Sequence, residues 1–474
     1  MAELLTPDIC VIGGGPAGTA MALRAARLGV PVVLVEKGAA GGSNLAWGAV
    51  PSKALVAASG LHEALRRGPA LGVSGAPLQV NFARLAEHIR SVGEEIAVHS
   101  SPARLAALGV RVIEAPARFL DRRTVIADDI TIIARRFVIA TGALPSIPEI
   151  PGIDTVEPIT FEEAYDLGRR PGHLLILGAD GHALELAQAY QRLGVDSTVL
   201  SARPALEGED PELAAIVLDR LKAEGLRIRD RASIVAFARR RGGLRVTLRE
   251  NGEEIAVEAT HLLIASGRRP NVADLALDAA GIAFGPDGIM VDNMLRTTNE
   301  RVHAIGDVIP GPAVANLGEH QAEGLLRNLV YRLPFKYRPE EVPVAFFTDP
   351  GLARVGPDET TARKQDSSVR ILRFPFAAND FARIGRMPEG LLKVVASKRG
   401  KVLGAAIAGH GASEQIALWS LALAKGLTVD DMLAFNPAYP SRSAIAGQIS
   451  EASAPVAPPG QMRSRIIEFL RNFG

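Results

Sequence analysis

Apolar and polar positions at the start of the chain follow the order strand, turn, helix, strand. An uninterrupted apolar run at residues 9–12 leads into a glycine-rich turn, and an amphipathic stretch follows from about residue 16 to residue 28. A second apolar run, PVVLVE, ends at Glu36. Strands that are buried on both faces have this apolar character, so the pattern predicts a parallel β-α-β unit.

The turn of this unit has the spacing G-x-G-x-x-G at Gly13, Gly15 and Gly18. The first glycine allows a tight turn, the second lets the backbone approach a pyrophosphate, and the third lets helix and strand pack closely. The N–H groups at the start of the helix attract phosphates, and Glu36 can accept hydrogen bonds from ribose hydroxyls. The unit therefore predicts a dinucleotide-binding site.

A second unit of the same order spans residues 173–201, but its turn is altered. The glycine positions are held by Gly178, Asp180 and Ala183. The carboxylate of Asp180 either turns outward as the N-cap of the helix, or it repels a pyrophosphate and weakens nicotinamide nucleotide binding. Ser201 replaces the acid expected after the second strand and Arg203 lies nearby, which favours NADPH over NADH.

Downstream patterns divide the rest of the chain. Residues 138–152 and 262–271 each join a predicted strand to a proline-containing crossing, and another apolar strand ends at Gly306 and Asp307. From about residue 341, alternating stretches predict antiparallel strands. Two helices are predicted near residues 412–426 and 429–434. The predicted fold class is α/β, with two Rossmann-like units and a C-terminal α+β domain.

The composition limits which cell compartment and which classes of binding partner we expect. With 53 Lys and Arg against 52 Asp and Glu, the formal net charge of +1 does not support a nucleic-acid partner. Cys10 is the single cysteine, which excludes an internal disulfide, indicates a reducing, cytoplasmic compartment, and is expected in the core. We expect neither a signal peptide nor a spanning helix, and the nine histidines suggest no metal site.

The last predicted helix, QMRSRIIEFLRNFG, is short, basic and amphipathic. Its apolar face holds Met462, Ile466, Phe469, Leu470 and Phe473. Such a helix either covers part of a dimer or makes peripheral contact with a membrane surface.

The motifs GGGPAG, PSKAL, ALELAQA, SGRRPN, AIGDV, TDPGLARVG and FPFAAND occur in this order along the chain. With them, the chain resembles the pyridine nucleotide-disulfide oxidoreductases, and within these the dihydrolipoamide dehydrogenases and mercuric reductases. The resemblance covers essentially the whole chain and implies a homodimer that uses FAD and NAD(P)H. It implies an FAD-binding domain at 1–150, an NAD(P)-binding-like domain at 151–271, a second FAD and central part at 272–340, and an interface domain at 341–474.

The resemblance also implies roles for individual residues. Lys53 would lie beside the flavin N5, where its cation favours the electron-rich reduced flavin, and Glu185 would pair with Lys53 near the nicotinamide. The alternative for both is a structural ion pair. The residues implied to contact FAD or NAD(P) are Gly13, Gly15, Gly18, Glu36, Gly42, Ser43, Ala140, Thr141, Gly142, Gly178, Ser201, Arg203, Gly267, Gly306, Asp307 and Ala315.

The chain departs from the family at its reactive groups. Asn44 and Ala49 stand where the family has two redox-active cysteines, whose thiolates pass electrons from the flavin to a disulfide or a metal. The resemblance also implies a C-terminal His-Glu pair that serves the partner subunit as acid and base. Asn436 and Ser441 stand in these two positions, and neither shuttles protons as histidine does. The dithiol and the base are therefore absent together.

Four further side chains are open to two interpretations each. His182, in the second glycine turn, and His320, expected near the flavin, are either structural or catalytic. Trp47 and Tyr439 either pack or form an apolar slot for a planar electron acceptor.

Three functions agree with this pattern. In the first, NAD(P)H reduces FAD, which passes electrons directly to a quinone-like or other small-molecule acceptor. In the second, FAD is retained but the donor is a different substrate or a protein partner. In the third, the protein is a non-catalytic FAD-binding subunit or sensor, although the presence of Lys53 and Glu185 argues against this role.

Overall fold

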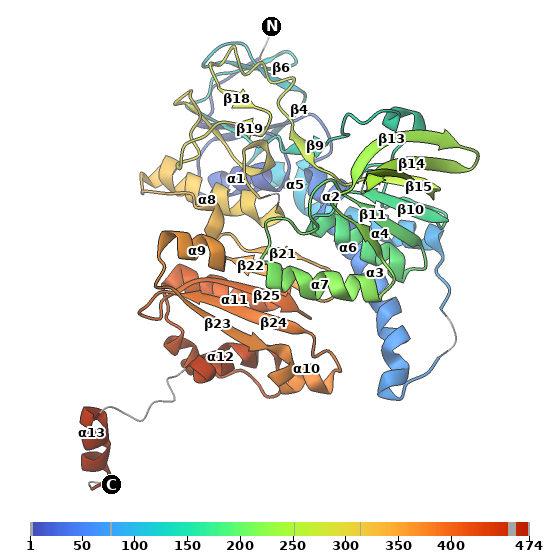
Figure 1. Cartoon of the computed structure of the whole chain (residues 1–474). Coiled ribbons are helices and arrows are strands. Elements are labelled where there is room, and N and C mark those ends of the chain that lie inside the picture. Colours follow the sequence, from blue (N-terminus) through green and yellow to red (C-terminus); the bar gives the residue numbers. More distant parts are fainter. Residues whose placement is uncertain (1–2, 76–77, 251, 313, 454–460, 473–474) are drawn as a thin grey trace.

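A computed structural model describes residues 3–75, 78–250, 252–312, 314–453 and 461–472. Figure 1 shows two α/β units next to each other, with a C-terminal sheet and its helices below them. This arrangement agrees with the α/β class and the three-part organisation that the sequence pattern predicts. The boundaries predicted at residues 150, 271 and 340 stay predictions.

The first unit is built on a five-stranded parallel sheet with the order β20-β8-β2-β3-β4. Its strands are β2 (Ile9–Ile12), β3 (Val32–Glu36), β4 (Arg111–Glu114), β8 (Arg136–Ile139) and β20 (Val302–Ala304). Helix α1 (Pro16–Arg27) connects β2 to β3, so the predicted β-α-β unit is confirmed. Helix α8 (Ala315–Tyr331) packs so closely on α1 that a Cβ at Gly318 would lie 2.4 Å from the Cβ of Ala17.

The second unit has a four-stranded parallel sheet with the order β12-β11-β10-β16. Its elements are β10 (His173–Leu177), α6 (Gly181–Arg192), β11 (Asp196–Leu200), α7 (Pro211–Ala223), β12 (Arg227–Arg229) and β16 (His261–Ile264). Alternate residues of β10 serve two layers: Leu174 and Ile176 pack towards α6, whereas Leu175 and Leu177 pack against an antiparallel sheet. That sheet consists of β13 (Ser233–Arg240), β14 (Gly243–Glu250) and β15 (Glu253–Ala259).

The C-terminal part is an antiparallel sheet with the order β21-β22-β25-β24-β23. Its strands are β21 (Val344–Phe346), β22 (Gly351–Val355), β23 (Arg370–Pro375), β24 (Gly390–Ala396) and β25 (Val402–Gly409). The helices are α9 (Glu359–Gln365), α10 (Asp380–Ile384), α11 (Ala412–Lys425) and α12 (Ile445–Ser453). The predicted helix at 412–426 is confirmed, but the next stretch is a 3₁₀ helix, η7 (Asp430–Ala434).

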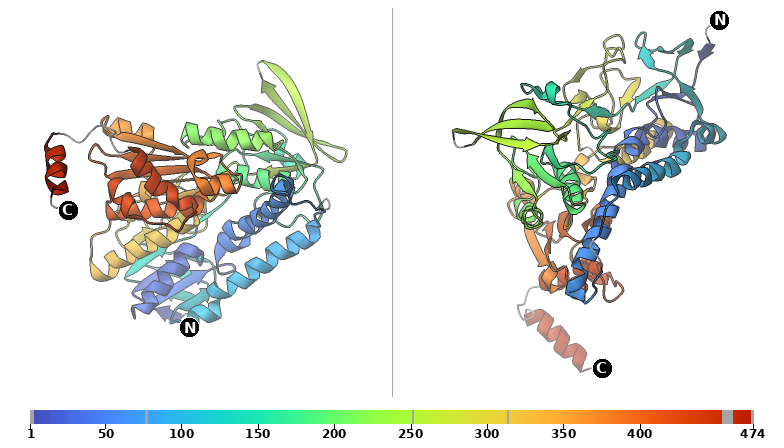
Figure 2. Two further views of the ribbon diagram at one scale, coloured as in Figure 1. Left: turned by 90° about the horizontal axis from the view of Figure 1, so that it is seen from below. Right: turned by 90° about the vertical axis from the view of Figure 1, so that its right-hand side faces the viewer.

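Four helices lie between the adjacent strands β3 and β4 along the chain: α2 (Gly42–Ala46), α3 (Ala49–Arg67), α4 (Phe82–Ala97) and α5 (Pro102–Ala107). Figure 2 shows α3 running from the first unit towards the C-terminal part, with α4 beside it. The Arg67 side chain, at the end of α3, donates to the carbonyl oxygen of Arg386 at 3.2 Å. Helix α3 therefore connects the first α/β unit to the C-terminal part.

The remaining elements are short. They are β1 (Glu3–Leu5), β5 (Ala117–Phe119), β6 (Val125–Ala127), β7 (Ile130–Ile132), β9 (Ala143–Pro145), β17 (Arg268–Pro270), β18 (Phe284–Gly285), β19 (Gly288–Ile289), η1 (Gly68–Leu71), η2 (Val98–Ser100), η3 (Ile153–Val156), η4 (Gly306–Val308), η5 (Pro339–Glu341), η6 (Phe376–Ala378) and η8 (Arg442–Ala444). Strands β9 and β17 form the crossing between the two α/β units.

The predicted C-terminal helix is α13 (Gln461–Arg471), drawn apart from the main body in Figure 1. Ile466, Phe469 and Leu470 are exposed on it, whereas the side chains of Met462 and Phe473 lie outside the described residues. Within the described ranges, no helix is long and apolar enough to cross a membrane. The same ranges contain no cluster of His, Cys, Asp and Glu that could hold a metal ion.

A buried cation joins the C-terminal sheet to the second unit. Lys393 Nζ lies 2.6 Å from Oδ2 of Asp210 and 2.9 Å from Oε2 of Glu359. The side chains of Lys393 and Asp210 are only 7% and 5% exposed. The hydrogen bond from Lys393 is the main reason that the pKa of Glu359 is lowered to about 2.

We predict that Lys393→Met lowers the melting temperature at pH 7, because the loss of one partner from a buried pair costs about 3–5 kcal/mol. Glu359 has a depressed pKa in the folded state, so its stabilising contribution is complete above its ordinary value of 4.5 and disappears towards pH 2. The gap in melting temperature between variant and wild type should therefore narrow from pH 7 to about pH 3. Lys398→Met, in an exposed turn, is the control. A gap that does not change with pH would contradict the prediction.

Candidate functional site

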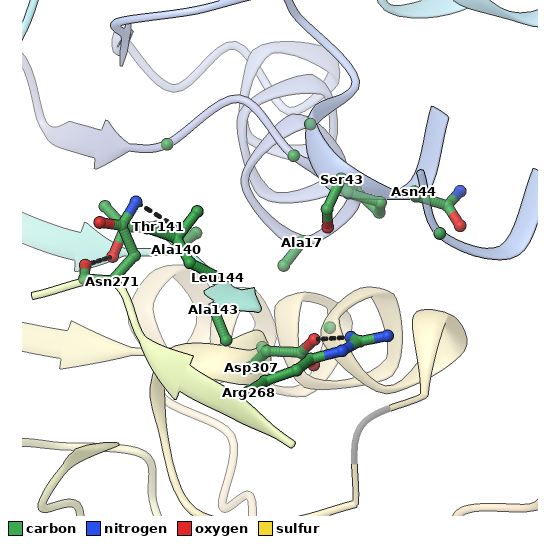
Figure 3. Close-up of a pocket in the computed structure, with 18 of the residues that line it drawn as sticks. Ala17, Ser43, Asn44, Ala140, Thr141, Ala143, Leu144, Arg268, Asn271 and Asp307 are labelled. Atoms are coloured by element: carbon green, nitrogen blue, oxygen red, sulfur yellow. Dashed lines mark hydrogen bonds and ion pairs between the residues drawn. The ribbon is translucent and has the colours of Figure 1, made fainter. Parts of the chain in front are cut away.

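A cavity of about 280 Å³ lies at the carboxyl ends of the strands of the first unit, where α3 and α6 approach it. The predicted residues that line it are Gly13, Gly15, Glu36, Gly42, Ser43, Asn44, Ala49, Lys53, Ala140, Thr141, Gly142, Glu185, Gly306, Asp307 and Ala315. Figure 3 shows Ser43 and Asn44 on one side of the cavity, with Thr141 and Asp307 across from them. The fold thus brings together residues from distant parts of the chain.

The first glycine turn has the geometry that a phosphate cradle requires. A Cβ at Gly15 would meet no atom within 4 Å, because Gly15 faces the cavity. At Gly18, a Cβ would lie 1.8 Å from the carbonyl oxygen of Gly13, so this glycine serves the packing of α1 on β2. Gly15 is the N-cap of α1 and makes no side-chain cap, which leaves the first N–H groups of the helix available to an anion.

Glu36, at the end of β3, holds the same turn from the other side. Its Oε1 accepts from the N–H of Gly38 at 2.7 Å, and its Oε2 accepts from the N–H of Gly14. Each carboxylate oxygen has a further lone pair, so the ribose contact predicted for Glu36 is compatible with these bonds.

Asp307 and Arg268 form an ion pair inside the cavity, drawn in Figure 3, with Nη1 of Arg268 2.9 Å from Oδ2 of Asp307. Burial raises the pKa of Asp307. The guanidinium of Arg268 also lies 5.5 Å from the ring centroid of Trp47. The N–H of Gly306 donates to Oε1 of the buried Gln321 at 2.7 Å, which fixes the backbone beside Asp307.

Lys53 and Glu185 form a second ion pair that lines the cavity. Lys53 Nζ lies 2.6 Å from Oε1 of Glu185, and the side chains are 28% and 1% exposed. Oε2 of Glu185 accepts from the backbone N–H of Phe347 at 2.8 Å. Both oxygens of this buried carboxylate therefore have a donor, which is the condition for keeping a charge in the interior.

The second glycine turn differs from the first in the side chains that lie at the start of its helix. Asp180 is exposed and is the N-cap of α6, where its Oδ1 accepts from the N–H of Ala183 at 2.8 Å. Asp180 therefore caps the helix, as the first alternative predicts, and its negative charge stays at the start of α6. A Cβ at Gly181 would lie 2.1 Å from the Phe346 ring, so that ring covers the start of α6. His182 packs edge-on against Phe346 and lines the cavity, and burial lowers its pKa.

Two family profiles cover nearly the whole chain. The profile described as pyridine nucleotide-disulphide oxidoreductase matches residues 7–345, and the profile of the dimerisation domain matches residues 342–448. The chain belongs to the pyridine nucleotide-disulphide oxidoreductase family. Family members use FAD and NAD(P)H, and the glycine turn, the free start of α1 and the carboxylates at 36 and 307 fit FAD.

Relatives and solved structures agree with this assignment. The chain is 33% identical over 454 residues to dihydrolipoyl dehydrogenase of Geobacillus stearothermophilus, which covers 94% of this chain and 96% of the relative. It is 32% identical over 428 residues to mercuric reductase of Bacillus cereus, with 90% and 68% covered. LpdA from Mycobacterium tuberculosis matches with a TM-score of 0.86 at 25% identity, over 94% of this chain and 99% of that chain. The flavoprotein disulfide reductase RclA from Escherichia coli, solved as a Cu(II) complex, matches with a TM-score of 0.83 at 26% identity, with the same coverage.

The residues that replace the family's thiols remain in the cavity. Asn44 and Ala49 both line it, on α2 and at the start of α3. Oδ1 of Asn44 is buried and has no hydrogen-bond partner in the described part of the chain. Cys10 is fully buried in β2, and burial raises the pKa of its thiol to about 12, so it is a core residue as predicted.

Other predicted site residues lie away from this cavity. They are Gly18, Gly178, Ser201, Arg203, Gly267, Asn436 and Ser441. Ser201 Oγ accepts from the N–H of Arg203 at 3.1 Å, and the Arg203 side chain is 83% exposed beside Glu207. Arg203 is therefore open to solvent whereas Ser201 is buried, and neither residue lines the cavity.

Two further side chains, His320 and Tyr439, do not line the cavity within one chain. His320 is exposed on α8. Tyr439 is 81% exposed, and its hydroxyl donates to Oδ2 of Asp380 at 3.2 Å. Within one chain, Tyr439 therefore forms no slot with Trp47, which does line the cavity.

Sequence reasoning missed several residues of the site. Arg268, Phe161 and Tyr165 line the cavity, and Gln321 and Phe347 support it from behind. Burial raises the pKa of Tyr165, so its hydroxyl stays protonated near neutral pH. Arg268 lies within the SGRRPN motif, which could have identified it, but no local pattern singles out the other four.

We predict that Gly15→Ala lowers FAD occupancy without unfolding the protein, because the added methyl group points into the cavity and meets no protein atom. Gly18→Ala should instead lower the melting temperature, since overpacking of this kind costs about 1–3 kcal/mol. Flavin absorbance per protein and thermal unfolding measure the two effects. Gly60→Ala, in an open position on α3, is the matched control. Full FAD occupancy in Gly15→Ala would contradict this reading of the turn.

Proposed function

We propose that the protein is an FAD-dependent oxidoreductase that passes electrons from NAD(P)H through FAD directly to a small, quinone-like acceptor. The single observation behind this proposal is the content of the cavity. It retains Lys53, Glu185 and the glycine turn, while Asn44 and Ala49 occupy the place of the dithiol. Neither side chain can attack a disulfide or bind a metal as a thiolate does.

The chain's own residues suit this chemistry. When bound, FAD supplies reversible acceptance of two electrons. The turn at Gly13–Gly15 and the start of α1 would bind its pyrophosphate, and Asp307 would accept a hydrogen bond from the ribityl chain. The ammonium of Lys53, held by Glu185, stabilises negative charge that develops nearby.

A second cavity is an argument for a planar electron acceptor. It measures about 310 Å³, and Asn44 lines both this cavity and the flavin cavity. Its walls combine the apolar Leu23, Leu45 and Ile96 with the basic Arg24, Arg27 and His99. The Asn44 amide, which lines both cavities, can donate a hydrogen bond to a quinone carbonyl. Reduction of a quinone to its hydroquinone by NAD(P)H takes up one proton, which solvent supplies.

A non-nicotinamide donor is the second candidate, and one observation favours it. The Asp180 carboxylate already binds an N–H at the start of α6, and Phe346 covers the same end of that helix. A pyrophosphate that approaches α6 therefore meets a negative charge and an aromatic ring. The exposed Arg203 favours the opposite conclusion and, with Ser201, a preference for NADPH.

We further place the enzyme in the cytoplasm as a homodimer. The dimerisation-domain match at residues 342–448 supports self-association, and the single, buried cysteine fits a reducing compartment. Contact of α13 with a membrane surface remains a hypothesis that its exposed Ile466 and Leu470 permit. A non-catalytic role is disfavoured because a scaffold has no evident use for a buried, fully paired Lys53–Glu185 group.

We predict that NADPH, and more slowly NADH, bleaches the flavin absorbance within seconds in an anaerobic mixing experiment. Normal photoreduction without any bleaching by either nucleotide would contradict NAD(P)H as donor and favour the second candidate.

Turnover with a quinone should survive iodoacetamide, because Cys10 is buried with a pKa of about 12. Loss of turnover after this treatment would contradict direct transfer from the flavin.

We predict that Asp180→Ser strengthens NADPH binding, with a KM at least tenfold lower. Serine keeps the N-cap, while removal of a like charge about 4 Å from a phosphate relieves up to about 4 kcal/mol of repulsion. Steady-state kinetics at fixed acceptor concentration measure the change. Asp358→Ser, at the N-cap of the remote α9, is the matched control. An unchanged KM in Asp180→Ser would show that this charge does not oppose the nucleotide.

A further inference from the structure

Phe347 contacts both members of the Lys53–Glu185 pair. Its backbone N–H donates to Oε2 of Glu185 at 2.8 Å, and Lys53 Nζ lies 4.5 Å from the centroid of its ring. The two contacts come from different parts of the residue. A side-chain substitution at Phe347 therefore removes the ring from Lys53 and leaves the N–H on Glu185.

The segment that carries Phe347 belongs to the C-terminal sheet but is fastened to α6. Gln188 on α6 donates to the carbonyl oxygen of Asp349 and accepts from its N–H, each at 2.8 Å. Arg192, one turn later, lies 3.1 Å from Oδ2 of Asp349. Phe346 packs on Gly181 at the start of the same helix. With anchors on both sides, the Phe347 ring has a defined position relative to Glu185.

The ring supplies an interaction that Glu185 alone does not provide. Lys53 is 28% exposed, so water competes for the ammonium on the sides that Glu185 leaves open. The negative face of an aromatic ring attracts a cation and excludes water from that side. Lys53 is thereby held between a carboxylate and a ring, next to the cavity.

We propose that Phe347 is a positioning residue by which the dimerisation domain holds the Lys53 ammonium in place and so raises the reduction potential of the bound flavin. The proposal rests on the proposed function only in that FAD occupies the cavity. It does not require NAD(P)H as the donor or a quinone as the acceptor. A cation held near the flavin favours the reduced form, which is richer in electrons, over the oxidised form.

The test compares Phe347→Leu, Phe347→Tyr and the control Phe284→Leu in the full-length holoprotein. The midpoint potential of the flavin is measured by photoreduction against a reference dye, so that no nicotinamide is needed. Phe347→Leu should shift the equilibrium towards oxidised flavin by about threefold to tenfold, the range expected for loss of a cation–π contact. Phe347→Tyr keeps the ring and should restore the wild-type potential. Phe284→Leu removes an exposed ring on β18 that lines none of these cavities and should leave the potential unchanged.

A second readout is independent of flavin. In FAD-free protein, the rate at which an amine-reactive reagent labels Lys53, located by peptide mass spectrometry, should rise in Phe347→Leu and not in Phe284→Leu. A wild-type potential in Phe347→Leu, or an equal shift in both leucine variants, would overturn the proposal. Failure of NAD(P)H to bleach the flavin would contradict the proposed donor but leave both of these measurements valid.

Discussion

The buried carboxylate of Glu185 is the group on which the architecture of the site depends. A charge that is 1% exposed is tolerated only if both oxygens are paired, and the two partners come from different parts of the fold. Lys53 arrives on α3, 132 residues away, and the N–H of Phe347 arrives from the C-terminal sheet, 162 residues away. The need to satisfy one carboxylate therefore brings three elements together beside the cavity, and the same contacts hold the ammonium of Lys53 in its lining.

The rest of the cavity shows which features of the family the chain has retained and which it has lost. The turn at Gly13–Gly15, the free start of α1 and the Asp307–Arg268 pair form a polar cradle that suits a dinucleotide. At the family's dithiol position the chain has Asn44 and Ala49, and Cys10 is too deeply buried to substitute. An amide can donate and accept hydrogen bonds but cannot carry electrons. The retained parts thus fit the proposed electron transfer by the flavin itself, in which Asn44 would orient the acceptor.

Local patterns predicted most of the fold. The strands β2, β3, β10 and β11 and the helices α1 and α6 follow apolar runs and glycine turns that are confined to short stretches of chain. The prediction for residues 429–434 was less accurate, since these few residues form a 3₁₀ helix rather than an α-helix. The N-cap of Asp180 could be named beforehand because capping depends on neighbours within one turn.

The sequence by itself determined the family, the first glycine turn and the absence of the thiols, because each of these is a matter of residue type at a fixed spacing. Only the tertiary structure decided which side chains share the cavity. Arg268 beside Trp47, Gln321 behind Gly306 and Phe347 on Lys53 are contacts between segments that are far apart in the chain, and no periodicity encodes them. The positions of Tyr439 and His320 relative to the cavity could not be predicted for the same reason, since they depend on how whole elements pack rather than on their neighbours in sequence.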